Sequence, residues 1–377
     1  MTAALDRRAA RGLAYSGLRF GYERAVTFAA TLVLARLLAP DEFGTVAFAL
    51  AVMNFLDAAT DLGLGAALVY RADSGEARVS STAFWMGIAG SCLLGVVLFL
   101  AAPSIASFGP RDEAESILRV LSLQFPLSAL GKTHEYLLRG RLEFKHLVRP
   151  FALGVSTRGA VAVGYALLGG GVWSLVAGQL AGTSVRSLTL WRAHPWRPRA
   201  TFSAAACRSL FRFGSGIVAV GVLGQAAKNF DYFVVGAKLG AAALGFYFLA
   251  FRLPELLVLG MFQLGNEVLF PFYARLKDGS HGTEALRAGY VRTVRLAAAV
   301  ALPVSFTMAA LATPIVHVVY GPEWAPAASP LALVAVWASL ASLASLPGTV
   351  FKATGRSWLL SATGLAQLCI LLPAVWV

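Results

Sequence analysis

The sequence predicts an all-α integral membrane protein with about 11 transmembrane helices in two parallel lobes. Three observations favour this fold class: an apolar composition, apolar blocks of membrane-spanning length, and basic residues that gather in alternate connections. Of the 377 residues, 58% are hydrophobic and 14% are charged, against about 45–50% apolar and about 25% charged in soluble domains. Mean hydropathy is +0.69, which excludes a disordered chain because disorder needs low hydrophobicity.

Apolar blocks of the length that crosses a bilayer recur along the whole chain. About 20 mostly apolar residues suffice for one helical span, and the connections between the blocks are mostly short. The predicted spans lie near 13–36, 44–67, 81–107, 114–134, 147–168, 171–191, 210–236, 243–270, 293–316, 328–350 and 358–377. A turn of three glycines, Gly169 to Gly171, forms the fifth connection.

Basic residues fix the predicted orientation of these spans. The N-terminal tail and every second connection hold about 22 lysines and arginines, and the other connections hold about 2. Cytoplasmic loops accumulate lysine and arginine, so we expect the N-terminus to lie in the cytoplasm of a bacterium whose inner membrane holds the protein. The formal net charge of +13 is thereby explained without nucleic acid, which is not an expected partner.

A weak internal repeat indicates two lobes of the same orientation. The stretch at 32–52, LVLARLLAPDEFGTVAFALAV, resembles that at 233–253, FVVGAKLGAAALGFYFLAFRL, and an even number of spans separates them. We therefore predict an N-terminal six-helix lobe at 1–191, a basic cytoplasmic linker at 192–209 and a C-terminal lobe at 210–377. The sequence ends within an apolar run, so the second lobe is expected to be incomplete, as in a fragment or a truncated gene product.

Charged residues within or at the ends of the spans are the candidates for function, because a charge at the bilayer centre costs about 2.5–3.5 kcal/mol on insertion scales. The bases are Arg19, Arg24, Arg36, Arg119, Arg158, Arg186, Lys228 and Arg252. The acids are Glu23, Asp57, Asp61, Asp231, Glu255 and Glu267. Arg19 and Glu23 are four residues apart, and Lys228 and Asp231, like Arg252 and Glu255, are three residues apart, so the members of each pair share a helix face. Local neutralisation within such pairs therefore competes with a functional reading. For Arg36, Arg119, Arg186 and Glu267, near span ends, neutralisation or snorkelling is favoured.

Asp57 and Asp61 are one helical turn apart, without a base close by on their own helix. Two neighbouring carboxylates repel, which would suit ion or proton coupling; the favoured alternative is charge pairing with a base of another span. Pro254 follows Arg252 within the eighth span. Proline kinks a helix, so Pro254 is a candidate hinge, although a static bend is an equal alternative. The Gly-x-x-x-Gly pairs at Gly178/Gly182 and Gly236/Gly240 permit close helix contact but are too common to locate an interface.

Four stretches resemble the polysaccharide and O-antigen flippases of the multidrug/oligosaccharidyl-lipid/polysaccharide exporter superfamily. They are LARLLAPDEFGTVAFALAVMNFLDAATDLGLGAALVYR (34–71), VLFPFYARLKD (268–278), GYVRTVRLAAAVALPVS (289–305) and YGPEWAPAASPLALVAVWA (320–338). The nearest likenesses are the lipopolysaccharide, colanic acid and teichuronic acid exporters. The resemblance covers nearly the whole chain and implies a V-shaped fold of two six-helix lobes, of which this chain would lack about three spans.

The resemblance also implies a function without covalent chemistry. Such a flippase would translocate an undecaprenyl-pyrophosphate-linked oligosaccharide across the cytoplasmic membrane by alternating access, in contact with membrane lipids and with a glycan polymerase or other assembly proteins as candidate partners. Spans one, two, seven and eight line the cleft in the resembled fold. Arginine binds phosphate bidentately and stays charged, so the candidate diphosphate ligands are Arg24, Arg252, Arg158 and Lys228. The acids Glu23, Asp57, Asp61, Asp231 and Glu255 are candidates for coupling or charge pairing.

Other function classes fit less well. The histidines lack metal-ligand spacing. The Gly131-Lys132-Thr133 stretch lacks the first glycine of a phosphate loop. We therefore expect that the protein binds no cofactor and is not an enzyme. A membrane glycosyltransferase or glycan polymerase could use the acidic pair Asp41-Glu42, but the outer loops are too short to build an acceptor site. A cation-coupled drug or metabolite antiporter of the same superfamily and an inactive truncated remnant remain as alternatives.

Overall fold

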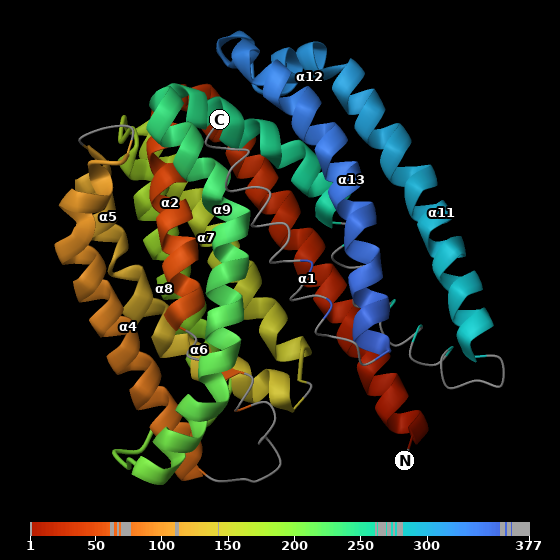
Figure 1. Ribbon diagram of the computed structural model, residues 1–377. Helices are drawn as coiled ribbons and strands as arrows, with labels where there is room; N and C mark the ends of the chain where they lie inside the picture. Colours follow the sequence, from red (N-terminus) through yellow and green to blue (C-terminus); the bar gives the residue numbers. More distant parts are fainter. Residues whose placement is uncertain are drawn as a thin grey trace. The chain divides into compact units, whose positions relative to one another are not determined.

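The computed structural model is mainly helical in the residues that it describes, and no strand occurs among them (Figure 1). Those residues are 2–60, 64, 65, 68, 77–109, 113–141, 143–260, 262, 269, 273, 276, 282–354, 359 and 363. Long apolar helices are the expected result, because a bilayer offers no hydrogen-bond partners to the backbone and a helix satisfies its backbone groups internally. The all-α membrane fold predicted from the sequence is confirmed.

The chain forms two compact units, Met1–Leu244 and Gly245–Val377, called here the N-terminal and C-terminal units. The helices that lie in the N-terminal unit are α1 (Thr2–Leu37), α2 (Pro40–Thr60), α4 (Ala77–Ala106), α5 (Glu113–Leu121), α6 (Gln124–Gly140), α7 (Lys145–Leu167) and α8 (Trp173–Ala193). Helix α9 (Ala204–Pro254) begins in this unit and continues into the next. It contains the turn between the seventh and eighth predicted spans, at Gly240 with φ 85°.

The C-terminal unit contains the end of α9 and a π-helical turn, η2 (Glu255–Leu259). It continues with α11 (Gly282–Ala310), α12 (Ala312–Val319), the 3-10 helix η3 (Pro322–Ala327) and α13 (Ala328–Ala353). Helices α11 and α13 lie side by side (Figure 1). The eleventh predicted span, 358–377, and the apolar chain end lie outside the described residues except for 359 and 363.

Several predicted spans each match one helix, the seventh and eighth share α9, and two others are divided. Four described helical stretches are long and apolar enough to cross a membrane by length and composition: Arg78–Ala106, Asn229–Leu259, Glu284–Ala310 and Pro322–Lys352. The span predicted at 114–134 is divided into α5 and α6 by a turn at Ser122 and Leu123. Likewise, the span predicted at 293–316 is interrupted at Leu311, between α11 and α12. The tight turn predicted at the three glycines is present, with Gly169 at φ 81° and Gly171 at φ 49°.

Small residues bring α7 into close contact with its neighbours. A Cβ atom added at Gly178 of α8 would lie 2.6 Å from the carbonyl oxygen of Arg158 in α7, and one at Gly182 would lie 2.7 Å from the Cβ of Arg158. On the side toward α1, a Cβ at Gly159 would lie 3.1 Å from the Cβ of Ala30. Because lipid supplies little hydrophobic drive for helix association, such close packing is what holds membrane helices together.

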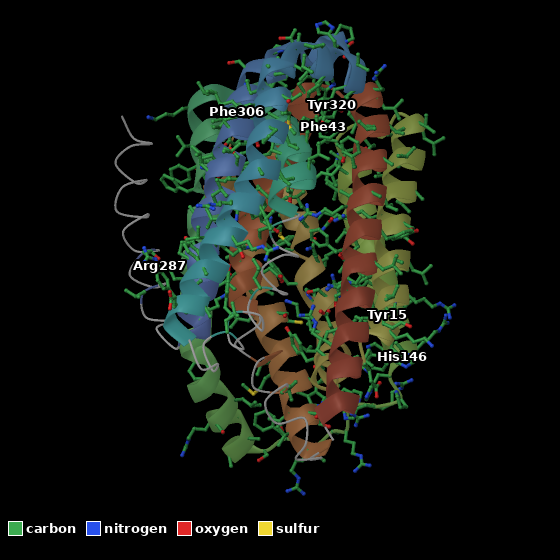
Figure 2. All side chains as sticks on the ribbon, turned by 90° about the vertical axis from the view of Figure 1, so that its right-hand side faces the viewer. Tyr15, Phe43, His146, Arg287, Phe306 and Tyr320 are labelled. Carbon is green, nitrogen blue, oxygen red and sulfur yellow. The ribbon has the colours of Figure 1, made fainter. Side chains whose placement is uncertain are left out.

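Within each unit, residues predicted for the cytoplasmic side of the membrane and residues predicted for its outer side lie toward opposite ends. In the N-terminal unit, Phe43 lies at one end, and Tyr15 and His146 lie toward the other (Figure 2). In the C-terminal unit, Tyr320 lies at one end and Arg287 toward the other (Figure 2). His146 and Arg287 belong to connections that the charge pattern assigns to the cytoplasm; the side of the membrane on which these ends lie stays a prediction.

Candidate functional site

Arg158 on α7 is held inside the N-terminal unit by neutral polar partners. Its guanidinium donates to Oε1 of Gln179 at 3.2 Å and to Oγ1 of Thr27 at 3.1 Å. Gln179 in turn donates to Oε1 of Gln124, at the first residue of α6, over 3.1 Å. Arg158 therefore links α1, α7, α8 and the start of α6 through one polar chain.

Glu23 on α1 lies among four arginines. Its Oε1 is 3.6 Å from Nε of Arg19, one helical turn earlier. Arg186, Arg158 and Arg24 also act on it electrostatically. The guanidinium carbons of Arg19 and Arg186 lie 4.3 Å and 4.7 Å from the centroid of the Phe151 ring, within cation–π range. The predicted pairing of Arg19 with Glu23 is thus one part of a larger cluster.

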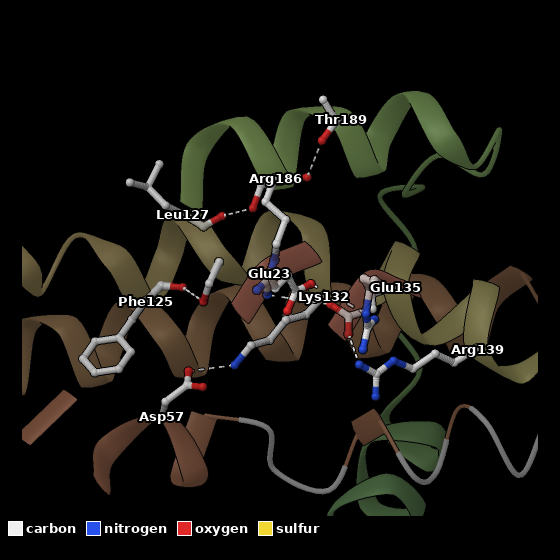
Figure 3. A network of polar contacts seen from close by, with 12 residues as sticks. Glu23, Asp57, Phe125, Leu127, Lys132, Glu135, Arg139, Arg186 and Thr189 are labelled. Carbon is white, nitrogen blue, oxygen red and sulfur yellow. Dashed lines mark hydrogen bonds and ion pairs between the residues drawn. The ribbon is translucent and has the colours of Figure 1, made fainter. Parts of the chain in front are cut away.

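A buried carboxylate, Glu135 on α6, extends this cluster toward the next helices. Its side chain is 8% exposed, and it pairs with Arg139 on α6 and, at 3.7 Å, with Arg186 on α8. Figure 3 shows Arg186 reaching from α8 toward Glu23 and Glu135. A carboxylate that is shared by two guanidiniums on two helices ties those helices together.

Asp57 on α2 accepts a hydrogen bond from Nζ of Lys132 on α6 over 2.9 Å (Figure 3). The structure thus shows Asp57 paired with a base of another helix. Asp61, one turn further on, lies outside the described residues, so ion coupling by the two carboxylates stays a prediction. We call the following charged residues the N-unit charge network: Arg19, Glu23, Asp57, Lys132, Glu135, Arg139, Arg158 and Arg186.

Arg24 lies on α1 next to this network and is half-buried. Its guanidinium carbon is 5.0 Å from the ring centroid of Phe20, one turn earlier on the same helix. The side chain of Lys228, another predicted diphosphate ligand, lies outside the described residues, so its pairing with the half-buried Asp231 stays a prediction. Glu267 also lies outside the described residues.

In the C-terminal unit, Arg252 forms the ion pair that its spacing predicts. Its Nη1 is 3.3 Å from Oε2 of Glu255, and its guanidinium carbon lies 4.3 Å from the ring centroid of Phe248. Pro254 lies between the two charged residues and is followed directly by the π-helical turn Glu255–Leu259. Such turns are rare and are frequent at functional sites; whether this one is a hinge stays a prediction.

The acidic pair of the first outer loop has a structural role. One carboxylate oxygen of Glu42 accepts a hydrogen bond from the backbone N–H of Ala39 at 2.8 Å. The other carboxylate oxygen lies 2.6 Å from the position that a Cβ atom on Gly171 would take, so Glu42 also contacts the glycine turn between α7 and α8. Among the described residues, no group of three or more histidines, cysteines or acids could hold a metal ion.

A family described as "Polysaccharide biosynthesis protein" matches residues 33–329. The chain belongs to this polysaccharide biosynthesis family. The match extends across both units, so the resemblance seen in separate stretches of the sequence is confirmed over most of the chain.

Individual relatives carry names from several surface polysaccharides. The chain is 33% identical over 319 residues to the succinoglycan biosynthesis transport protein ExoT of Rhizobium meliloti, and the matched region covers 82% of this chain and 62% of the relative. It is 27% identical over 306 residues to the teichuronic acid biosynthesis protein TuaB of Bacillus subtilis, covering 80% and 62%. It is 24% identical over 332 residues to the lipopolysaccharide biosynthesis protein WzxC of Escherichia coli, covering 86% and 65%. The chain thus spans less than two thirds of the length of these relatives.

Solved structures show the same fold at low sequence identity. A multidrug resistance MATE family transporter of the MOP superfamily, in an inward-facing conformation, matches with a TM-score of 0.69 at 18% identity, over 89% of this chain and 82% of that one. The lipid II flippase MurJ matches with a TM-score of 0.74 at 13% identity, over 89% and 75%. The fold is therefore the one that these two transporters share, and the protein is a multi-pass membrane protein.

Sequence reasoning missed the contacts between helices that dominate the N-terminal unit. Glu135 was assigned no role, and Arg186 was predicted to be neutralised locally or to snorkel, whereas the two pair across α6 and α8. The spacing of Glu135 and Arg139, four residues apart, was the signal that could have pointed to a buried acid. By contrast, Arg119 is neutralised as predicted, by Glu115 at 2.8 Å on its own helix.

Proposed function

We propose that this protein translocates a polyprenyl-pyrophosphate-linked oligosaccharide across the cytoplasmic membrane for surface polysaccharide biosynthesis, with its N-terminus in the cytoplasm. The observation that carries the proposal is the family match over residues 33–329. Relatives named for succinoglycan transport, teichuronic acid and lipopolysaccharide biosynthesis all concern glycans of the cell surface. MurJ, named a lipid II flippase, shares the fold.

We further propose that Arg24 and Arg252 contact the diphosphate of the substrate. A diphosphate cannot enter hydrocarbon without counter-charges, and a guanidinium offers a fixed fork of donors for it. Both side chains are half-buried on apolar helices. The Nε of Arg252 is buried and makes no hydrogen bond to any residue that the structure describes.

Arg158 supports the site differently in this proposal. Its guanidinium already donates to Thr27 and Gln179, and Thr27 is close to Arg24 along α1. We assign Arg158 a positioning role for this stretch of α1, with contact to the diphosphate as the alternative. Lys228 stays a proposed ligand on the basis of the resemblance alone.

Complementation tests the proposal. The chain is expressed in a strain that lacks its own flippase of this family, and surface glycan is measured by immunoblot, with membrane insertion of the chain checked in parallel. We expect partial or full restoration with a matching glycan, and at least a tenfold loss of restoration in Arg24→Glu and Arg252→Glu. The matched control is Arg287→Glu, a change at an exposed arginine of α11, which should restore as well as the unmodified chain.

Two results would count against the proposal. Failure of the inserted chain to restore any glycan, together with no binding of purified protein to undecaprenyl-pyrophosphate glycan, would reject translocation. Resistance to several cationic drugs on expression, without glycan restoration, would favour the antiporter instead. Unchanged restoration by both charge reversals would remove Arg24 and Arg252 from the site while leaving the transport proposal standing.

A further inference from the structure

Two histidines that are far apart in the sequence, His134 on α6 and His194 directly after α8, meet inside the N-terminal unit. Their ring centroids are 6.5 Å apart, and the residues are 0% and 3% exposed. Neither takes part in the proposed transport site. Buried histidines need hydrogen-bond partners, and the partners of this pair come mainly from the segment 194–203, which we call the linker segment.

The linker segment is fastened to the N-terminal unit by an aromatic cluster. The ring centroid of Trp196 lies 5.3 Å from that of His134 and 6.0 Å from that of Phe84 on α4. Trp191, at the end of α8, packs on His134 at 4.9 Å, and Arg197 lies over the Trp191 ring at 5.5 Å. The linker segment therefore packs on α4, α6 and α8 rather than crossing open solvent.

Backbone hydrogen bonds continue this attachment toward α9. The N–H of Arg199 donates to Oγ of Ser81 at 3.1 Å, and its carbonyl accepts from Nε1 of Trp85 at 2.9 Å. The N–H of Ser203 donates to Oγ1 of Thr82 at 3.1 Å. Three residues of α4 thus bind the second half of the linker segment, and the two histidines bind the first half.

The hydrogen bonds of the two rings fix where each proton lies. The carbonyl oxygen of Trp196 can only accept, so Nε2 of His134, at 3.2 Å, carries a proton. The backbone N–H of Trp196 can only donate, so Nδ1 of His194, at 3.1 Å, carries a lone pair and its proton lies on Nε2. A second proton on His194 would have to bind Nδ1, the atom that accepts from Trp196. Protonation and this hydrogen bond therefore exclude each other.

We propose that His134 and His194 form a proton-sensitive clasp that holds the linker segment on the N-terminal unit and opens when they are protonated. Protonated His194 loses the bond to Trp196, and protonated His134 places a positive charge beside His194 and Arg197, the charged or titratable groups that act on it. The groups that act on His194 are Arg141, Glu143, Arg197 and His146, so three cationic or titratable side chains oppose its protonation and one acid favours it.

The pH range follows from the environment of His194. Burial is the largest cause that lowers the pKa of His194 below its ordinary value of 6.5, and the positive charge of Arg141 is the next largest. The negative charge of Glu143 raises the same pKa. Released from the clasp, the imidazole regains its ordinary pKa of about 6.5. A histidine whose pKa is lower in the bound state stabilises that state fully only above the ordinary value. The clasp is accordingly strongest above about pH 6.5 and weakens as the pH falls below it.

Spin-label mobility tests this proposal without any transport assay. Cys92, Cys207 and Cys369 are replaced by alanine, and a nitroxide is attached through a Pro195→Cys change at an exposed position in the first half of the linker segment of the purified full chain. We expect an immobilised spectrum at pH 8 and a mainly mobile one at pH 5, with a single reversible midpoint. In His194→Gln, whose amide can still accept from Trp196 but does not titrate, the spectrum should stay immobilised down to pH 5.

Surface variants make the test independent of changes to the buried rings. Arg141→Gln should move the midpoint to higher pH, because a cation that opposes protonation is removed, and Glu143→Gln should move it to lower pH. The matched control His146→Gln, at an exposed histidine, should retain the full transition. The proposal is overturned if the unmodified chain shows no change of mobility between pH 8 and pH 5. It is also overturned if the transition persists in a His134→Gln/His194→Gln double variant.

Discussion

The intramembrane charges of the two units are held in different ways. In the N-terminal unit, Glu135 pairs with Arg139 on α6 and Arg186 on α8, and Arg158 on α7 hydrogen-bonds to Thr27 on α1 and Gln179 on α8. In the described part of the C-terminal unit, Arg252 pairs with Glu255 on the same chain turn. The difference shows that charged side chains contribute to helix–helix packing in the N-terminal unit. In the described part of the C-terminal unit, packing depends on apolar side chains such as Tyr320 and Trp324, which are both fully buried.

The helix contact beneath Arg158 offers the largest expected effect. Gly182→Leu places a Cβ 2.7 Å from the Cβ of Arg158 and from the carbonyl oxygen of Gly154, where neither atom can move without separating α7 from α8. Overpacking usually costs about 1–3 kcal/mol and occasionally more. We expect loss of most folded protein, measured by size-exclusion chromatography after heating in detergent.

The control for this change lies on the same pair of helices. A Cβ at Gly164 of α7 would meet nothing within 4 Å, so Gly164→Ala should leave the melting temperature unchanged or raise it slightly, because alanine favours a helix by about 1 kcal/mol over glycine. If Gly182→Leu melts like Gly164→Ala, the close contact of α7 and α8 does not exist and the network cannot depend on it.

A buried ion pair that crosses helices and a more exposed pair on one helix give the second test. Glu135→Gln removes a carboxylate whose side chain is 8% exposed and leaves Arg186 and Arg139 without it, so we expect a loss of about 1–3 kcal/mol. Glu115→Gln breaks a pair with Arg119 in which the side chains are 34% and 41% exposed, and should cost less than about 1 kcal/mol. Thermal melting of the two purified variants compares them directly; equal losses would show that the Glu135 contacts do not stabilise the helix packing.

The sequence predicted what depends on neighbours along the chain. Apolar blocks and alternating charge predicted the membrane helices, the glycine run predicted the turn at 169–171, and spacing predicted the pairs of Arg19 with Glu23 and of Arg252 with Glu255. Each of these depends on the helical period or on backbone freedom, which a local pattern carries.

Contacts between helices were beyond such reasoning. Whether Glu135 meets Arg186, or His134 meets His194, depends on how each helix is rotated and shifted against its neighbour, and the 3.6-residue period says nothing of that. The break at Ser122 likewise has no glycine or proline at the turn itself. It occurs where the carbonyl oxygen of Ser122 lies against Gly95 of α4, 3.1 Å from where a Cβ would be, a feature of packing rather than of local sequence.

Exchanging partners gives the smallest expected effect and tests the comparison most directly. In the C-terminal unit, Arg252→Glu combined with Glu255→Arg keeps an i,i+3 pair on one face, and such pairs contribute only about 0.2–0.5 kcal/mol. The melting temperature of the purified double variant should change little, even if transport is lost. The same exchange at Glu135 and Arg186 places an arginine beside Arg139 and Lys132 and leaves Arg139 without its acid, so it should melt well below the unmodified protein. If the two exchanges cost the same, the charges of the N-terminal unit are no more tied to its packing than those of the C-terminal unit.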